Sequence, residues 1–171
     1  FVGQFGKDVT VPKFLTAMKQ LGFSDVVEVA AGADICTIEE AHDFMEKVPL
    51  EQRFMATSCC PSWRMMARRL FPAESGNISM TYTPMVYTAR LVKKEHPNSK
   101  VVFIGPCAAK KLEAMQDDIR TDVDFVLTYE ELMGIFEAKE INFSTLPDSP
   151  DLDEGTRAGR GFAVAGGVAA A

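Results

Sequence analysis

Four short runs of β-branched and aromatic residues, each leading into a helical stretch, constrain the fold of this 171-residue chain more than any other feature. The strands are expected at residues 26–29, 54–57, 101–104 and 125–128. Each leads through a short turn into residues with helical periodicity. Strands rich in Val, Ile and Phe that alternate with amphipathic helices predict an α/β fold, in which a largely parallel sheet is flanked by helices.

The first expected helix has a marked beginning and end. Residues 11–21 repeat apolar side chains at helical spacing. Thr10 is a suitable N-cap, Pro12 lies in the first turn and Gly22 follows as the stop.

A second helix is expected to begin near Thr37, after a small-residue turn at residues 30–32. Glu40 stands three residues after Thr37, which is the spacing of a capping box. The other expected elements are helices at residues 61–70, 83–95 and 129–138, a helical segment from residue 108, an exposed loop at 147–160, and a small-residue strand and turn at 161–171.

Charge and hydropathy exclude several classes of partner. The formal charge is −6 and the isoelectric point is near 5.0, so no basic face for nucleic acid is expected. No apolar run reaches the length needed to cross a bilayer, and residues 1–19 lack the pattern of a signal peptide. These observations predict a cytoplasmic protein with neither a nucleic-acid nor a membrane partner. Four cysteines are too few and too unevenly spaced for a disulfide scaffold, which favours reduced thiols or metal ligands.

Two cysteine motifs follow predicted strands. Residues 57–63 read Thr-Ser-Cys-Cys-Pro-Ser-Trp, and residues 105–113 read Gly-Pro-Cys-Ala-Ala-Lys-Lys-Leu-Glu. Ligands of α/β proteins gather where strand ends meet helix N-termini. A thiol at a helix N-terminus has a lowered pKa, so Cys59, Cys60 and Cys107 are candidates for thiolate nucleophiles or soft-metal ligands. Proline beside cysteine is also common around iron–sulfur clusters.

Other interpretations of the cysteines stay open from spacing alone. All three motif cysteines could be small buried side chains, and Cys36 is expected to be plain core. A thiol enzyme with Cys59 or Cys60 as the nucleophile is a further alternative. Neither His42 nor His96 adjoins a cysteine motif, so the sequence indicates no base for such an enzyme.

Together the motifs resemble the first and second signature motifs of iron-only (FeFe) hydrogenases, T-S-C-C-P-x-W and M-P-C-x-x-K-x-x-E. Residues 32–41, 122–124 and 165–168 also resemble landmarks of that family, in the family's order. The resemblance implies one lobe of the two-lobed catalytic domain. It implies reversible reduction of protons to hydrogen at the H-cluster, which joins a 4Fe-4S cubane to a diiron unit with carbonyl and cyanide ligands.

The resemblance also implies roles for the motif residues. Cys60 and Cys107 would ligate the cubane, Cys59 would pass protons, and Lys110 would donate a hydrogen bond to a cyanide ligand. The alternative for Lys110 is a solvated helix charge paired with Glu113 three residues later.

Two carboxylates, Glu40 and Asp43, match the proton relay of the family, with Asp43 in place of the usual glutamate. Three other positions depart from the family pattern: Gly105 where methionine is usual, Met80 where a relay serine is usual, and Ala163 where a pocket glycine is usual. Such departures are typical of a divergent or sensory branch. The remaining cofactor-binding residues implied by the resemblance are Pro84, Pro106, Phe162 and Ala163.

The resemblance predicts that residues 1–171 form a partial catalytic domain. The family's first pocket strand is expected upstream and its third motif, with two more cysteines, downstream. A cubane with two of four thiolates would be labile, so the isolated fragment is expected to be inactive and without cofactor. Ferredoxin or an accessory iron–sulfur domain is the expected electron partner, and protons and hydrogen are the expected substrates. The alternatives are a hydrogen- or redox-sensing protein and an iron–sulfur scaffold protein, and retention of Cys59 and Lys110 counts against the scaffold.

Overall fold

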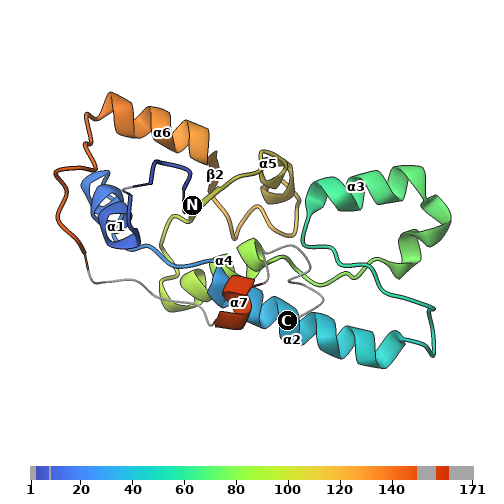
Figure 1. Ribbon diagram of the computed structural model, residues 1–171. Coiled ribbons are helices and arrows are strands. Elements are labelled where there is room, and N and C mark those ends of the chain that lie inside the picture. Colours follow the sequence, from blue (N-terminus) through green and yellow to red (C-terminus); the bar gives the residue numbers. More distant parts are fainter. Residues whose placement is uncertain (1–2, 8, 150–156, 162–171) are drawn as a thin grey trace.

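The computed structural model describes residues 3–7, 9–149 and 157–161. Figure 1 shows α1 and α6 at one end of the molecule and α3 with the 3-10 helix η1 at the other. The elements are, in chain order, α1 (Val11–Gln20), α2 (Ala30–Lys47), α3 (Pro61–Leu70), η1 (Pro72–Asn77), α4 (Pro84–Glu95), β1 (Val102–Gly105), α5 (Ala109–Ala114), β2 (Phe125–Thr128), α6 (Tyr129–Ala138) and α7 (Arg157–Gly161).

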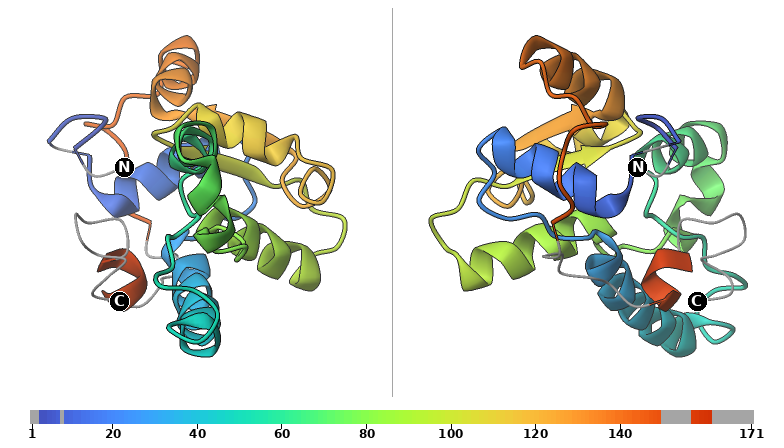
Figure 2. Two further views of the ribbon diagram at one scale, coloured as in Figure 1. Left: turned by 90° about the vertical axis from the view of Figure 1, so that its right-hand side faces the viewer. Right: turned by 60° about the vertical axis from the view of Figure 1, so that its left-hand side comes forward.

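The sheet consists of β1 and β2, which pair in parallel with Phe103 opposite Val126. Successive side chains of a strand point to opposite faces. Ile104 packs against the core formed by α1 and α6, whereas Phe103 and Val126 pack against the core that contains α4. Figure 2 shows α6 and α4 on opposite sides of the two strands. The predicted α/β class, with a parallel sheet flanked by helices, is therefore confirmed.

The core between α1 and α6 is apolar and rich in aromatic rings. Thr10 caps α1, as predicted, because its side chain accepts a hydrogen bond from the backbone N–H of Lys13 at 3.4 Å. Thr128 and Glu131 form a capping box at the start of α6. The buried members of this core are Phe14, Ala17, Met18, Leu132, Phe136 and Leu146.

The predicted start of the second helix is wrong. Helix α2 begins at Ala30, not near Thr37, and the Thr37 hydroxyl is buried without a hydrogen-bond partner instead of capping. Gly32 is a crossing point between helices rather than part of a turn. A Cβ atom on Gly32 would lie 2.3 Å from the carbonyl oxygen of Pro84 and from Oγ1 of Thr88. Helix α2 therefore begins before the predicted capping box, and its first turns pack closely on α4.

Two of the four predicted strands are also wrong. Residues 26–29 form no strand: Val27 alone takes part in an isolated bridge, and Val26 packs against the core between α1 and α6. In residues 54–57 only Ala56 is paired, through an isolated parallel bridge to Ile78. A strand needs a neighbour along its length, and here the two segments share hydrogen bonds at one point only.

The loop predicted at residues 147–160 ends in a helix, α7. A Cβ atom on Gly159 would lie 2.2 Å from the carbonyl oxygen of Ala30, so glycine permits close packing on α2. Arg160 donates three hydrogen bonds to the Glu28 carboxylate, at 2.8, 3.0 and 2.9 Å. A strand and turn were predicted at residues 161–171. Gly161 is instead the last residue of α7, and residues 162–171 lie outside the described residues. No helix in the described part of the chain is both long and apolar enough to cross a membrane.

Candidate functional site

The first cysteine motif forms the turn that leads into α3. Cys60 is the N-cap of α3, as expected for a residue at a helix N-terminus, and its Sγ atom accepts a hydrogen bond from the backbone N–H of Trp63 at 3.4 Å. The Trp63 indole donates to the carbonyl oxygen of Thr57 at 3.0 Å. These two bonds hold the turn across the cysteines. Cys60 is exposed and Cys59 is half-buried.

The second motif lies beside the first, and a hydrogen bond from Lys110 of the second motif to Cys59 of the first connects them. Cys107 is half-buried and lies between β1 and α5. The Lys110 ammonium donates to the carbonyl oxygen of Cys59 at 3.1 Å and to the carboxylate of Glu113 at 2.7 Å. Lys110 does pair with Glu113, but the pair is buried rather than solvated, with side-chain exposures of 13% and 3%. An ammonium has three N–H donors, so one remains for a further acceptor.

The Cys59 thiol does not have the lowered pKa that its place before a helix predicted. Burial raises the pKa of Cys59, and the nearby Glu40 carboxylate raises it further, while a contact with the Thr57 hydroxyl opposes the rise. Cys59 precedes the N-cap of α3, so the first-turn N–H group of Trp63 serves Cys60 instead. Burial therefore favours the protonated form of the Cys59 thiol, as the role of a proton donor requires.

Glu40, on α2, lies beside Ser58 of the first motif. Its side chain is 6% exposed and accepts a hydrogen bond from the backbone N–H of Ser58 at 3.4 Å. Burial raises the pKa of Glu40, although hydrogen bonds from Ser58 and the Ser79 side chain act in the opposite direction. A carboxyl group whose pKa is raised, close to a thiol, has the chemistry of a proton-exchange partner.

Asp43 lies one turn further along α2 and forms an ion pair with Lys47. Its side chain is 19% exposed, so it is nearer to solvent than Glu40. The negative charge of Asp43 contributes to the raised pKa of Glu40, which places the two carboxylates close together. Glu40 is thus the most buried of the three groups, and Cys59 and Asp43 are both more exposed than it is.

The structure shows the surroundings of two of the departures from the hydrogenase motifs. The Ser79 hydroxyl lies beside the Glu40 carboxylate, while the neighbouring Met80 is exposed. That Met80 replaces a relay serine of the family stays a prediction. At Gly105 a Cβ atom would lie 2.7 Å from the Phe103 ring, so that ring occupies the space of a larger side chain.

Two predicted pocket residues can be placed. Pro84 is buried at the first turn of α4, where its carbonyl oxygen accepts from Thr88 at 2.9 Å. Pro106 is exposed beside Cys107. Phe162 and Ala163 lie outside the described residues.

The thiols fit part of a ligand set for an iron–sulfur cubane. Cys60 and Cys107 offer soft ligands on two turns that Lys110 joins, and a backbone N–H already points at the Cys60 sulfur. Within the described ranges, no group of three or more Cys, His, Asp or Glu side chains is arranged to hold a metal ion. A complete cubane therefore needs thiolates in addition to these two.

The family is decided by a match over the whole sequence. The model for the "iron only hydrogenase large subunit, C-terminal domain" matches residues 1–171. The chain belongs to the iron-only hydrogenase family. Members of this family carry iron–sulfur clusters, and the family as a whole consists of oxidoreductases with relatives that serve cluster assembly.

Known proteins similar to the chain come from both groups. It is 34% identical to iron hydrogenase 1 of Clostridium pasteurianum, over 96% of the chain and 31% of that relative. It is 31% identical to the periplasmic [Fe] hydrogenase large subunit of Nitratidesulfovibrio vulgaris, over 94% of the chain and 42% of that relative. A cytosolic Fe-S cluster assembly factor, NAR1 of Phaeosphaeria nodorum, is 33% identical over 66% of the chain and 21% of its own length. The chain thus spans less than half of each of these relatives.

Solved hydrogenase structures share the fold. A variant of apo [FeFe]-hydrogenase HydA1 from Chlamydomonas reinhardtii superposes with a TM-score of 0.76 and 26% identity, over 86% of this chain and 43% of that one. The structure titled as stepwise H-cluster assembly in HydA(deltaEFG) has a TM-score of 0.75 and 31% identity, over 95% of this chain and 44% of that one.

Sequence reasoning missed two buried serines of the site. Ser58 and Ser79 are each 2% exposed, and both contact Glu40. Ser58 also donates to the carbonyl oxygen of Thr81 at 2.9 Å. Ser58 stands inside the first motif and was therefore visible in the sequence, whereas Ser79 reaches the site only through the bridge between Ala56 and Ile78.

Proposed function

We propose that this chain contributes to a hydrogenase catalytic site that interconverts protons and hydrogen at an H-cluster. The observation that carries the proposal is the half-buried thiol of Cys59 beside the buried carboxyl group of Glu40, between two further thiols and the Lys110 ammonium. A cluster-assembly site needs thiols but has no use for a proton path that leads to one of them.

The proposed roles follow from the contacts. Cys60 and Cys107 would hold the cubane, with two more thiolates from elsewhere in the protein. When bound, such a cofactor supplies the electrons and the centre at which hydrogen forms. Lys110 would donate its remaining N–H to an acceptor on the cofactor, while Glu113 and the Cys59 carbonyl fix its position.

Proton movement would use the chain's own groups. The Cys59 thiol delivers its proton at Sγ and is reprotonated from the carboxyl group of Glu40. Glu40 in turn exchanges protons toward Asp43, whose pairing with Lys47 marks the outer end of the path. Glu40, Ser58 and Ser79 are all less than 10% exposed, which keeps bulk water out of the inner part of the path. Pro84, Pro106, Phe162 and Ala163 complete the proposed pocket.

Electrons would come from ferredoxin or an accessory iron–sulfur domain. The exposed side chains of Arg68 and Arg69 lie on α3, the helix that begins at Cys60, and they suit an acidic carrier. A cytoplasmic location is also part of the proposal. Among the named relatives, the assembly factor is described as cytosolic and one hydrogenase as periplasmic.

A scaffold function is the second candidate, because of the similarity to the assembly factor. The test is hydrogen evolution from reduced viologen by the protein with its full set of thiolates, matured anaerobically, beside Cys59→Ala and Cys60→Ser variants. Rapid evolution that both variants lose supports the hydrogenase. Full iron content with little hydrogen would instead support a sensor, and uptake of a cubane alone would support the scaffold.

The cofactor prediction for the isolated chain has its own test. After anaerobic reconstitution with iron and sulfide, we expect the chain to retain both in far less than stoichiometric amount, because two thiolates bind a cubane weakly. Stoichiometric iron and acid-labile sulfide after gel filtration would contradict this.

A further inference from the structure

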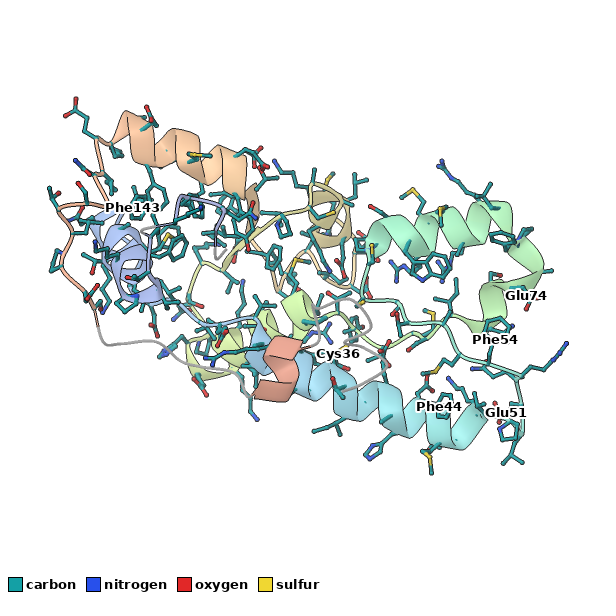
Figure 3. All side chains as sticks on the ribbon, viewed as in Figure 1. Cys36, Phe44, Glu51, Phe54, Glu74 and Phe143 are labelled. Atoms are coloured by element: carbon teal, nitrogen blue, oxygen red, sulfur yellow. The ribbon has the colours of Figure 1, made fainter. Side chains whose placement is uncertain are left out.

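A fourth cysteine, Cys36, belongs to a small buried cluster against which Cys59 packs, although the two cysteines are far apart in the sequence. Cys36 is on α2 and is 1% exposed, while Cys59 is half-buried and packs against the small cluster of Ala33 and Cys36. Figure 3 labels Cys36 on the stretch of α2 in the middle of the molecule. All four cysteines are free thiols in this structure. The proposed proton path has no use for Cys36.

The surroundings of Cys36 protect it from direct reaction. It packs with Ala33 and Tyr87, and burial, followed by the charges of Glu40 and Cys59, raises the pKa of its thiol to about 12. A reagent in solution therefore reaches Cys59 and not Cys36. Oxidation of Cys36 therefore requires a partner next to its cluster, and Cys59 is the thiol that packs against that cluster.

Competing pairs of thiols are less suitable. Cys59 and Cys60 are adjacent, and Cα atoms joined by a trans peptide are about 3.8 Å apart, which is short of the usual disulfide range of about 4.4–6.8 Å. The Cys60 sulfur is also held by the backbone N–H of Trp63, on the exposed side of the turn.

We propose that Cys36 and Cys59 are a redox pair that forms a reversible disulfide when a peroxide oxidises Cys59. In the first step the Cys59 sulfur attacks the peroxide, giving a sulfenic acid and releasing water or an alcohol. In the second step the Cys36 sulfur attacks the sulfenic sulfur, the disulfide forms, and its hydroxyl leaves with the Cys36 proton as water. The peroxide is reduced by two electrons and the two thiols lose two hydrogen atoms.

The disulfide would protect Cys59 from irreversible oxidation to the sulfinic acid. Disulfides inside cells are usually transient and redox-sensing, which agrees with a pair that a dithiol can reduce again. If Cys59 passes protons, as in the proposed function, the disulfide would also stop turnover, but the pair itself rests on the packing of the two thiols alone.

The experiment uses the reduced 171-residue chain and hydrogen peroxide. After treatment, free thiols are blocked with N-ethylmaleimide and the protein is digested with trypsin and sequenced by tandem mass spectrometry. We expect the number of blockable thiols to fall from four to two, with the peptides Gln20–Lys47 and Phe54–Arg64 linked through Cys36 and Cys59. Dithiothreitol should restore all four thiols.

Matched variants separate this pair from the alternatives. Cys60→Ser should keep the linked peptides, and Cys36→Ala should lose them and gain sulfinic acid at Cys59, with an unchanged circular dichroism spectrum as the folding control. A dominant link between Cys59 and Cys60 or between Cys60 and Cys107 would overturn the proposal. So would Cys36 that stays fully reduced in the wild-type chain while Cys59 is oxidised. Either result leaves the proposed hydrogenase function intact, since none of these measurements involves the cofactor.

Discussion

At one end of the molecule α1 and α6 bury aromatic and aliphatic side chains, whereas the thiol site around α2, α3 and α5 buries carboxylates, hydroxyls and an ammonium. Phe143 marks the first region and Cys36 adjoins the second in Figure 3. In the first region Phe14 and Phe136 meet edge to face, with ring centroids 6.2 Å apart. In the second, Glu40 and Glu113 are 6% and 3% exposed. Burial of apolar area stabilises a fold, but burial of charge costs free energy unless partners compensate it.

The difference indicates which region supports the structure and which carries chemistry. The apolar region has many interchangeable contacts, so its stability is shared among rings and methyl groups. The thiol site has few contacts, each of them specific, and its groups have raised pKa values. Perturbed ionisable groups concentrated in one place are typical of functional sites.

Truncation in the apolar region should give the largest effect. Phe136 is 2% exposed and packs on Phe5, Phe14 and Phe143. Phe136→Ala is expected to lower the free energy of unfolding by about 3–5 kcal/mol, because it removes a buried ring and leaves a cavity. Urea unfolding followed by circular dichroism measures this. Phe125→Ala, at a ring that is 60% exposed, is the control and should change stability little. If Phe136→Ala lowered the free energy of unfolding by less than about 1 kcal/mol, the apolar region would not be the main source of stability.

The ion pair of the thiol site should come next. Lys110→Met leaves the Glu113 carboxylate buried without its partner, which is expected to cost about 3 kcal/mol. It also removes the positive charge that lowers the pKa of the Cys59 thiol, so alkylation of Cys59 should become slower. The double variant Lys110→Met with Glu113→Leu should recover much of the lost stability, because no charge is then left uncompensated. The exposed pair of Lys111 and Glu131 is the control, and Lys111→Met should have little effect. Equal losses in the single and double variants would contradict a charge effect.

The pH dependence of Glu40 should be a smaller effect. Burial raises the folded-state pKa of Glu40 above its ordinary value of 4.5, so the folded chain binds this proton more tightly than the unfolded chain. The stability that this proton contributes is fully present below pH 4.5 and is lost as the pH rises through the folded-state pKa. Glu40→Gln should remove that decline, and at pH 7 it should be at least as stable as the wild type. Urea unfolding at several pH values tests this, and an unchanged decline in Glu40→Gln would refute it.

Asp124 is a carboxylate outside the thiol site and serves as the comparison for Glu40. Desolvation acts to raise its pKa, but hydrogen bonds from Lys100 and Lys93 and the backbone N–H of Val101 lower it well below 3.8. Its contribution is therefore present above pH 3.8 and is lost as the pH falls. Asp124→Asn should cost on the order of 1 kcal/mol at pH 7 and progressively less in acid. The stability difference between wild type and variant should change with pH in opposite directions for Glu40→Gln and Asp124→Asn. A change in the same direction for both would contradict the distinction between the thiol site and the rest of the fold.

Several features of the fold were predictable from local sequence. Helix α1 begins and ends where Thr10 and Gly22 predicted, and the strands β1 and β2 lie within one residue of their predicted positions. The two cysteine motifs were visible as well, because each combines rare residues at fixed spacing within a few positions. Such signals are local, since a cap or a β-branched run acts on its immediate neighbours.

Only the tertiary structure decided the rest. Helix α2 includes Gly32, which the sequence placed in a turn, and there it packs closely on α4, while Ser79 joins the site because its segment bridges to Ala56. The pKa of Cys59 is raised because burial outweighs its position before a helix. The contact between Cys36 and Cys59 has no local signal, because it joins residues of separate elements. Local propensity contributes only tenths of a kcal/mol per residue, whereas packing and desolvation contribute several, so long-range contacts prevail where the two disagree.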